Sequence, residues 1–249
     1  MNILDEIVAN TKAKVSIAKE KVSLDDLAST IHLNKIIKSK FKASLKDKEQ
    51  AIIAEIKKAS PSAGVISENF DPVTKAKEYE AFGASALSIL TEEDYFLGST
   101  QYLKDVKKIS KLPILRKDFI VDIYQIYESK FIGSDCILLI ASILSDEELN
   151  DFTQLADTLG LDYIIEVHNE DELKRVQDFS EAIIGVNNRD LKSFTVDIEN
   201  SIRLKQLFNQ DNLFVAESGI KGQSDINKLL QHGINIFLIG ESLMKGDFA

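Results

Sequence analysis

The sequence predicts an α/β fold, a closed (β/α)8 TIM barrel with an N-terminal helical extension. After residue 48, short apolar runs of strand length alternate with amphipathic helical stretches, and sustained alternation of this kind indicates a parallel sheet. Several of these runs end on an ionisable residue, as in AIIAEIKK (51–58) and YIIEV (163–167). Because the carboxyl ends of barrel strands form one shared face, these charges predict an enzyme site rather than a solvated surface.

The first 48 residues have a helical and charged pattern. Ile3, Leu4, Ile7 and Val8 form an apolar stripe at helical spacing, which predicts a helix packed on another part of the fold. No linker or low-complexity tract divides the chain. We therefore expect a helical extension over residues 1–48, packed on a barrel over residues 49–249.

Strands and helices are predicted in strict alternation along the barrel. The strands are expected at 51–56, 85–90, 113–117, 135–140, 162–167, 182–186, 212–216 and 235–239. The helices are expected near 71–82, 99–110, 122–132, 145–159, 169–178, 196–208 and 222–231. Two helix starts carry capping signals, since Asp71 precedes Pro72 and Ser145 begins a Ser-Asp-Glu-Glu capping box.

A doubly wound sheet is the competing fold. It is disfavoured because no glycine-rich dinucleotide loop follows a strand, whereas a barrel of this length is ordinary and leaves no sheet edge exposed. After LIGESLM (238–244) the chain reaches Ala249 without room for a full eighth helix. We therefore expect the last helix to be truncated.

Composition limits the classes of partner. The formal net charge is −10, so nucleic acid and anionic membranes would be repelled. The single Cys136 excludes an internal disulfide and fits a reducing compartment. No apolar run reaches the length of a membrane span, and the N-terminus lacks a signal-peptide pattern. We expect a cytoplasmic protein without nucleic-acid or membrane partners.

Side-chain alternation places several strand-end charges on the same face. Glu55 and Lys57 share the face of Ile53, and Lys117 shares the face of Leu115. The groups that this pattern brings towards one point are Glu55, Lys57, Lys117, Glu166, Asn187 and Glu217. An inert ion-pair network is one interpretation, although burying charges costs several kcal/mol unless each is paired. Mixed lysine and glutamate also suit proton transfer, because environment can separate their pKa values.

A second signal follows the seventh and eighth predicted strands. AESGI (216–220) and LIGESL (238–243) end these strands, where barrels often bind phosphate through backbone N–H groups. Gly219 and Gly240 would allow close approach of the backbone. Each alone is an ordinary turn glycine, but both together favour phosphate. The carboxylate of Glu241 would then have to face away from the ligand.

The loop over residues 57–70 is longer than most strand-to-helix loops. Its proline and glycine could shape a lid over a substrate, and a plain surface loop is equally compatible with its composition. Ser60 and Ser62 within it lack a nearby base, which argues against a serine triad.

Histidine and cysteine give weaker signals. His32, His168 and His232 have no metal-ligand spacing and are expected at the surface or at helix ends. Cys136 lies among apolar residues and is expected to be a buried small hydrophobe rather than a nucleophile.

At these motifs the chain resembles the indole-3-glycerol phosphate synthases of tryptophan biosynthesis, and the resemblance runs nearly end to end. The motifs that carry it are ILDEIV (3–8), FKASLK (41–46), AEIKKASPSAG (54–64), ILTEEDYFLGS (89–99), PILRKDFI (113–120), IIEVHNEDEL (164–173), IGVNNRDL (184–191), VAESGI (215–220) and LIGESLM (238–244). The motifs of the first, third and sixth strands are together highly specific to that family.

The resemblance implies a carboxy-lyase without metal or organic cofactor. Its reaction would close the ring of 1-(2-carboxyphenylamino)-1-deoxyribulose 5-phosphate, giving indole-3-glycerol phosphate, carbon dioxide and water. By resemblance, Lys117 would protonate the substrate carbonyl and Glu166 would be the acid and base of the dehydration. Lys57 would hold the substrate carboxylate and assist the acid step. The residues that would orient these groups are Glu55, Asn187 and Glu217.

The resemblance also implies a set of substrate contacts. Those enclosing the anthranilate ring would be Phe96, Phe119, Leu138 and Leu191, and Arg189 would steer the anionic end. Those holding phosphate would be Ser218, Gly219, Gly240 and Glu241. Ser60, Ser62 and Leu238 complete the expected substrate-binding residues.

The expected partner is the small phosphorylated substrate, bound by a monomer, with association with other tryptophan-pathway enzymes left open. One rival is another phosphate-binding barrel of the phosphoribosylanthranilate isomerase type. That enzyme uses a Cys and Asp pair, whereas the first strand here carries Glu-Ile-Lys. The other rival is a non-catalytic barrel kept as a scaffold, and the intact charges at the strand ends count against it.

Overall fold

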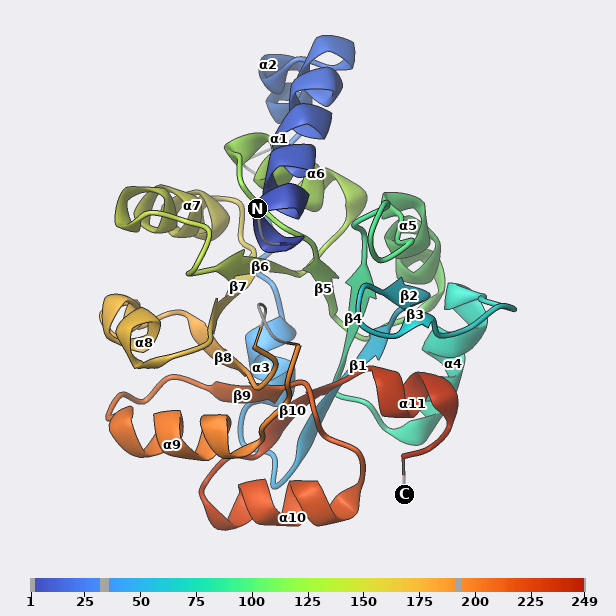
Figure 1. Cartoon of the computed structure of the whole chain (residues 1–249). Coiled ribbons are helices and arrows are strands. Elements are labelled where there is room, and N and C mark those ends of the chain that lie inside the picture. Colours follow the sequence, from blue (N-terminus) through green and yellow to red (C-terminus); the bar gives the residue numbers. More distant parts are fainter. Residues whose placement is uncertain (1–2, 32–35, 191–193, 249) are drawn as a thin grey trace.

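The computed structural model describes residues 3–31, 36–190 and 194–248. The strands of its barrel are β1 (Ala51–Ile56), β4 (Ala86–Leu90), β5 (Ile114–Lys117), β6 (Cys136–Ile140), β7 (Asp162–Val167), β8 (Ile183–Asn187), β9 (Phe214–Glu217) and β10 (Ile236–Ile239). They are parallel and close in the order β1-β10-β9-β8-β7-β6-β5-β4 (Figure 1). The predicted (β/α)8 barrel is confirmed, with each predicted strand placed to within about two residues.

Helices cover the outside of the barrel and alternate with its strands. They are α4 (Pro72–Phe82), α5 (Thr100–Ile109), α6 (Ile123–Ile132), α7 (Asp146–Thr158), α8 (Glu170–Val176), α9 (Glu199–Leu207) and α10 (Gln223–Gln231). Both predicted capping signals are confirmed. Asp71 accepts the backbone N–H of Val73, and Ser145 forms a capping box with Glu148. Each cap fixes the point at which a strand-to-helix loop ends.

Alternation along the strands separates two apolar clusters. In β1, Ile52 and Ala54 face outwards and pack beneath the helices, whereas Ala51 and Ile53 face inwards and fill the barrel. The next inward position in β1 is Glu55. The period of two that builds the core therefore also delivers charged side chains to the C-terminal end of the barrel.

The N-terminal end of the barrel is closed by α3 (Phe41–Leu45). Phe41 and Leu45 are completely buried and belong to the inward-facing cluster. The backbone N–H of Lys42 donates to Asp162 Oδ2 at 2.8 Å, which ties α3 to the start of β7. A barrel closed at this end offers its opposite end to a ligand.

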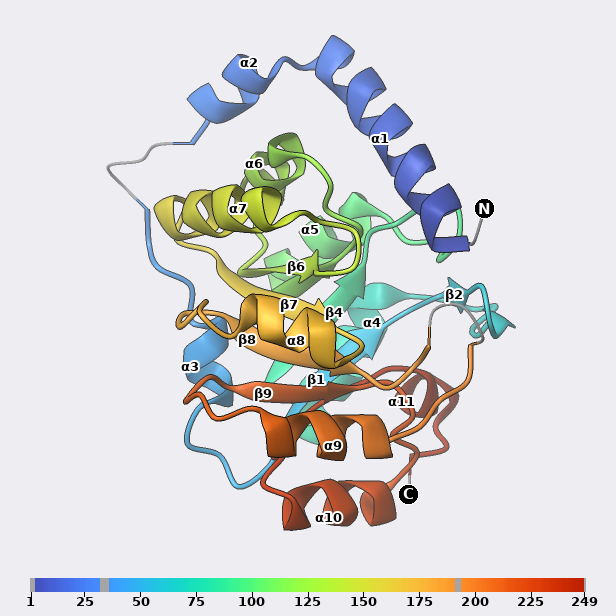
Figure 2. The ribbon, with the colours of Figure 1, turned by 60° about the vertical axis from the view of Figure 1, so that its left-hand side comes forward.

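Two further helices, α1 (Ile3–Lys21) and α2 (Leu24–Ser29), lie over α6 (Figure 2). Val15 and Leu27 pack with Tyr124, and Lys19 Nζ lies 2.7 Å from Asp122 Oδ2. These contacts hold the second half of α1 against the outside of the barrel.

The first half of α1 extends beyond α6 to the C-terminal end of the barrel. Of the predicted apolar stripe, Ile7 is buried and the other three residues are half-buried. Lys14 Nζ lies 2.8 Å from Asp94 Oδ2 in the loop after β4. The division of the chain at residue 48 into extension and barrel stays a prediction.

The loop over residues 57–70 contains a short antiparallel hairpin that the sequence analysis did not predict. Its strands are β2 (Ala59–Ser60) and β3 (Gly64–Val65). The hairpin stands beside the C-terminal ends of β1 and β4 (Figure 1). The loop is therefore placed next to the open end of the barrel.

The last element is α11 (Glu241–Lys245), a short helix that follows β10 and packs beside β1 (Figure 1). Gly240 forms the turn between β10 and α11. No helix in the described part of the chain is long and apolar enough to span a membrane.

Candidate active site

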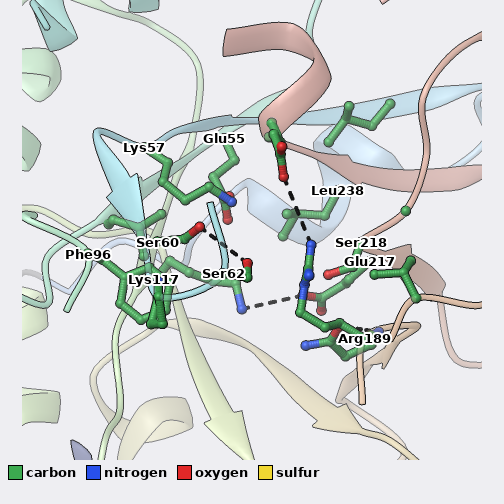
Figure 3. Close-up of a pocket in the computed structure, with 18 of the residues that line it drawn as sticks. Glu55, Lys57, Ser60, Ser62, Phe96, Lys117, Arg189, Glu217, Ser218 and Leu238 are labelled. Carbon is green, nitrogen blue, oxygen red and sulfur yellow. Dashed lines mark hydrogen bonds and ion pairs between the residues drawn. The ribbon is translucent and has the colours of Figure 1, made fainter. Parts of the chain in front are cut away.

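A cavity of about 640 Å³ opens at the C-terminal end of the barrel (Figure 3). Every predicted site residue that the structure describes lines this cavity. These residues are Glu55, Lys57, Ser60, Ser62, Phe96, Lys117, Phe119, Leu138, Glu166, Asn187, Arg189, Glu217, Ser218, Gly219, Leu238, Gly240 and Glu241. Leu191 lies outside the described residues. The structure brings the others together, and their individual roles stay predictions.

Lys117, at the end of β5, lies between two carboxyl groups. Its Nζ donates to Glu166 Oε2 at 2.8 Å. The same atom lies 3.4 Å from Glu217 Oε2 (Figure 3). Only 2 % of each glutamate side chain is exposed. Two buried carboxylates facing one ammonium would leave a net negative charge away from water, which is costly.

Lys117, Glu166 and Glu217 have pKa values that are shifted in different directions. Burial alone would lower the pKa of Lys117, but Glu166, Glu217 and Glu55 together raise it. Burial opposes ionisation of Glu166, yet Lys117 and His168 bring its pKa well below the ordinary value. Burial, aided by the charge of Glu166, raises the pKa of Glu217 to about 8 in spite of Lys117. At pH 7 the cavity therefore holds an ammonium, a carboxylate and a carboxylic acid.

The carboxyl of Glu217 rests against a glycine of the next strand. A Cβ at Gly185 of β8 would come within 2.2 Å of Glu217 Oε1, and that oxygen makes no hydrogen bond within the described residues. Gly185 was not among the predicted site residues. A glycine inside a strand is the signal that indicates such a close approach.

Lys57 and Glu55 form a second ion pair at the end of β1, with Lys57 Nζ 2.6 Å from Glu55 Oε1 (Figure 3). A Cβ at Gly240 would come within 2.3 Å of the same oxygen. Gly240 was predicted only as a phosphate-binding turn. The structure shows that its missing side chain also makes room for Glu55.

Asn187, the last residue of β8, orients Glu166. Its Nδ2 donates to Glu166 Oε1 at 3.2 Å, and its Oδ1 accepts the backbone N–H of Arg189 at 3.0 Å. The Arg189 guanidinium lies 4.0 Å from Glu241 Oε2. The Glu241 carboxylate lies towards Arg189, and Lys245 binds its other oxygen at 2.6 Å. That it faces away from a bound phosphate stays a prediction.

One wall of the cavity is apolar. The rings of Phe96 and Phe119 lie 6.0 Å apart between centroids and are tilted by 41°, and Leu138 joins them in the lining. α1 was expected to pack on another part of the fold, but it was not predicted to line the site. The residues of α1 that line the cavity are Ile3, Leu4 and Ile7.

A buried carboxylate fixes the loop that carries Phe96. Glu92 accepts the backbone N–H groups of Asp94, Tyr95 and Phe96 at 3.0, 2.7 and 3.0 Å. The Tyr95 hydroxyl donates to Glu6 of α1 at 2.9 Å. The loop and α1 therefore support the aromatic wall together, a contact between distant segments that sequence periodicity does not reveal.

The opposite end of the cavity is formed by two backbone turns. Ser218 and Gly219 have positive φ values of 66° and 80°, and a positive φ is uncommon for a residue other than glycine. Asn188 Nδ2 donates to the carbonyl of Ser218 at 3.2 Å and so braces this turn. At the second turn, Gly240 precedes α11 and no side chain caps the first N–H groups of the helix.

His168 lies nearer the site than the sequence analysis indicated. It precedes the N-terminus of α8, but only 12 % of its side chain is exposed, and Nε2 lies 3.3 Å from Glu166 Oε1. A period of two from Glu166 is the signal that was missed. Cys136 is buried inside the barrel as expected, where burial raises the pKa of its thiol. His232 is exposed at the end of α10, and His32 lies outside the described residues.

Within the described ranges, no group of three or more His, Cys, Asp or Glu side chains is placed to hold a metal ion. The cavity instead presents an ammonium, a carboxylate and a carboxylic acid within a few ångströms of one another. Such a set can donate and accept protons at neutral pH.

Comparison with known proteins identifies close relatives. The chain matches the family model for indole-3-glycerol phosphate synthase over residues 4–248. The indole-3-glycerol phosphate synthase of Ruminiclostridium cellulolyticum is 50% identical over 246 residues, which cover 98% of this chain and 94% of the relative. That of Clostridium acetobutylicum is 48% identical, with 98% and 92% covered. These matches support the resemblance in the sequence motifs, and not the rival isomerase or scaffold.

Solved structures of another enzyme share the fold. The tryptophan synthase A-subunit of Pyrococcus furiosus superimposes with a TM-score of 0.60 over 79% of this chain and 89% of that chain, at 16% identity. Identity this low supports the barrel architecture alone.

Proposed function

The chain belongs to the indole-3-glycerol phosphate synthase family, and we propose that the cavity at the C-terminal end of its barrel is the active site. The protein is a carboxy-lyase of tryptophan biosynthesis. It closes the ring of 1-(2-carboxyphenylamino)-1-deoxyribulose 5-phosphate and releases indole-3-glycerol phosphate, carbon dioxide and water.

In this proposal Lys117 is the general acid of ring closure. The aromatic carbon that bears the carboxylate attacks the ketone carbon, a carbon–carbon bond forms, and the carbonyl oxygen takes a proton from the ammonium. Carbon dioxide then leaves, and the electron pair of the broken bond restores the aromatic ring. A fixed ammonium in a water-poor cavity stabilises the developing oxyanion more than bulk water does. The reaction consumes one proton overall, which Lys117 recovers from solvent.

Glu166 is the proposed acid and base of the dehydration. The hydroxyl formed in the first step leaves as water with the help of the ring nitrogen's electron pair, and the neighbouring ring carbon loses a proton to form the double bond. The step therefore adds one proton to the leaving oxygen and removes one from carbon. Lys117, recharged from solvent, would protonate the leaving oxygen, and Glu166, whose low pKa supports its starting this step as the carboxylate, would accept the carbon's proton and return it to Lys117 across their 2.8 Å hydrogen bond.

The remaining polar groups would orient the substrate and these two residues. Lys57, held by Glu55, would bind the substrate carboxylate until it leaves as carbon dioxide. Asn187 would hold Glu166, as its 3.2 Å hydrogen bond supports. Glu217, protonated at neutral pH, would donate a hydrogen bond to a substrate hydroxyl.

The two ends of the cavity suit the two ends of the substrate. The anthranilate ring would lie against Phe96, Phe119 and Leu138, with Leu191 as a further predicted contact. The backbone turns at Ser218–Gly219 and Gly240–Glu241 would hold the phosphate, because uncapped N–H groups attract anions. Arg189 would steer the anionic end, and the other proposed contacts are Ser60, Ser62 and Leu238. Phosphate bound far from the reacting carbons would orient the chain for cyclisation.

We also propose that the chain acts as a cytoplasmic monomer. The described residues that the proposed mechanism uses all line the cavity of a single copy. Leu191 belongs to the same chain but lies outside the described residues. The single buried Cys136 is compatible with a reducing compartment.

The observation that carries the proposed chemistry is the position of Lys117 between Glu166 and Glu217 inside the cavity. The test is to incubate the purified protein with the carboxyphenylamino-deoxyribulose phosphate and follow indole fluorescence. The chain contains no tryptophan, so its own fluorescence does not mask the product. A signal that grows with enzyme concentration supports the proposal, and the absence of product at saturating substrate would contradict it.

A further inference from the structure

We propose that His168, held by Glu172, is a positioning residue for Glu166 that fixes the direction of its carboxylate and keeps a positive charge beside it. The inference rests on the proposed function, in which Glu166 transfers protons during the dehydration. The inference is supported by a continuous series of polar contacts that runs from α8 into the cavity.

Glu172 fixes one side of the imidazole. Its Oε2 accepts the backbone N–H of His168 at 2.8 Å and lies 3.1 Å from the ring's Nδ1. Its Oε1 accepts the side-chain amide of Asn169 at 2.7 Å. Asn169 in turn caps α8 by accepting the backbone N–H of Glu172 at 3.0 Å. The carboxylate is thus held by three donors, and the orientation of the ring follows from it.

The other side of the ring faces Glu166. Nε2 is buried and lies at ion-pair distance, 3.3 Å, from Glu166 Oε1, and it has no hydrogen-bond partner among the described residues. The same carboxylate accepts Asn187 Nδ2 at 3.2 Å through Oε1 and Lys117 Nζ at 2.8 Å through Oε2. Glu166 is therefore held by groups from three different strand ends.

An imidazole between two carboxylates satisfies both only as a cation. Nδ1 must carry a proton to donate to Glu172, so a neutral ring would present the lone pair of Nε2 to Glu166. An imidazolium carries N–H groups on both nitrogens. The balance of charge agrees, because burial would lower the pKa of His168 but Glu166 and Glu172 raise it to about 10.

Within the part of the chain that the structure describes, the ion pairs of the ring are those with the two glutamates. From α9, Asn200 donates to the backbone carbonyl of His168 at 3.0 Å, and Arg203 binds Asn200 on its far side at 2.7 Å. From β8 and β5, Asn187 and Lys117 contact the glutamate at the end of β7 rather than the ring. The charges that act on the ring directly are those of the two glutamates.

The positive charge of His168 matters because Lys117 loses its own charge during the reaction. When Lys117 gives its proton to the substrate, Glu166 loses the positive charge of its nearest partner. A carboxylate in a buried site would then gain affinity for protons and lose its capacity to act as a base. His168 does not take part in that transfer, so it keeps Glu166 ionised until the dehydration.

The test compares His168→Ala, which removes the donor and the charge, with His168→Gln, which retains a neutral N–H donor. His232→Gln, at an exposed histidine on the end of α10, is the matched control. We expect His168→Ala to lower kcat about tenfold or more while KM changes by less than about threefold. Without the cation the pKa of Glu166 rises, so both His168 variants should move the acidic limb of the kcat–pH profile to higher pH. His168→Gln should recover part of kcat but not the acidic limb.

An unchanged kcat and acidic limb in both variants, or an effect confined to KM, would overturn the inference. A wild-type protein that forms no indole would instead overturn the proposed function. The wild-type chain allows a test that does not depend on whether the variants fold. The ¹⁵N shifts of the two ring nitrogens should report an imidazolium at pH 8, and a neutral His168 ring at that pH would overturn the inference.

Discussion

Glu166 and Glu217 approach the same ammonium but hold different protonation states at neutral pH. Lys117 Nζ lies 2.8 Å from Glu166 Oε2 and 3.4 Å from Glu217 Oε2. Glu166 also contacts Asn187 and His168, whereas Glu217 Oε1 has no hydrogen-bond partner in the described chain. The environments thus drive two pKa values apart, as acid–base chemistry in one cavity requires.

Replacing the proposed general acid tests the first step. We predict that Lys117→Met lowers kcat by at least about 10³-fold, because no other ammonium contacts both glutamates in the described cavity. Lys108→Met, at an exposed lysine of α5, is the control and should leave turnover unchanged. Indole fluorescence measures the rate, and far-UV circular dichroism checks the fold. Wild-type turnover by the Lys117 variant would refute the assignment.

Glu166→Gln tests the dehydration step. The amide keeps the shape of the side chain but cannot accept a proton from carbon, so kcat should fall about 100-fold while KM changes by less than about threefold. Glu170→Gln, on the exposed first turn of α8, provides the control. If steady-state kinetics show loss of substrate binding instead, Glu166 is a structural residue.

The contact between Gly240 and Glu55 predicts a coupling in stability. A Cβ at residue 240 would come within 2.3 Å of Glu55 Oε1, so Gly240→Ala should lower the free energy of unfolding by about 1–3 kcal/mol. In a Glu55→Ala background the same substitution should cost less, because the clashing oxygen is gone. Urea unfolding of the four proteins gives the coupling. Strictly additive effects would show that the two residues do not constrain each other.

The raised pKa of Glu217 predicts a specific pH dependence of stability. The group titrates near 4.3 in the unfolded chain and at about 8 in the folded protein. Between these values the unfolded state binds fewer protons, so the contribution of Glu217 to stability is present below about pH 4.3 and is lost as pH rises towards 8. Glu217→Gln cannot ionise, so its Tm relative to wild type should increase from pH 5 to pH 8. A constant or falling difference would mean that Glu217 is ionised in the folded state.

Much of the fold, and the convergence of the site residues, could be predicted because both depend on the two-residue alternation of side chains along a strand. Alternation along β1 places Ile53 in the core and Glu55 above it, and the same rule applies to β5, β7 and β9. Parallel strands in a closed barrel then bring these ends to one face. Local sequence is sufficient for this step, because no long-range information beyond closure is needed.

A glycine inside a strand could have marked Gly185, but the partners of the supporting residues could not be predicted, since they depend on contacts between distant segments. Gly185 matters because Glu217 of the neighbouring strand needs its space. Glu92 matters because three N–H groups of its own loop converge on it, and Glu6 of α1 then fixes that loop through Tyr95. The surface against which α1 packs likewise depends on tertiary structure. An amphipathic pattern shows that a helix packs, but it does not show which surface the helix packs against.

A crystal structure of the protein with bound indole-3-glycerol phosphate is the decisive test of whether Lys117 and Glu166 act on the same substrate in this cavity. We expect the indole ring against Phe96 and Phe119, and the phosphate at the turns after β9 and β10. Lys117 and Glu166 should lie within hydrogen-bond distance of the ring edge or the glycerol hydroxyls. Product bound outside this cavity, or inside it with Lys117 and Glu166 both out of contact, would show that these two residues are not the acid and base of the reaction.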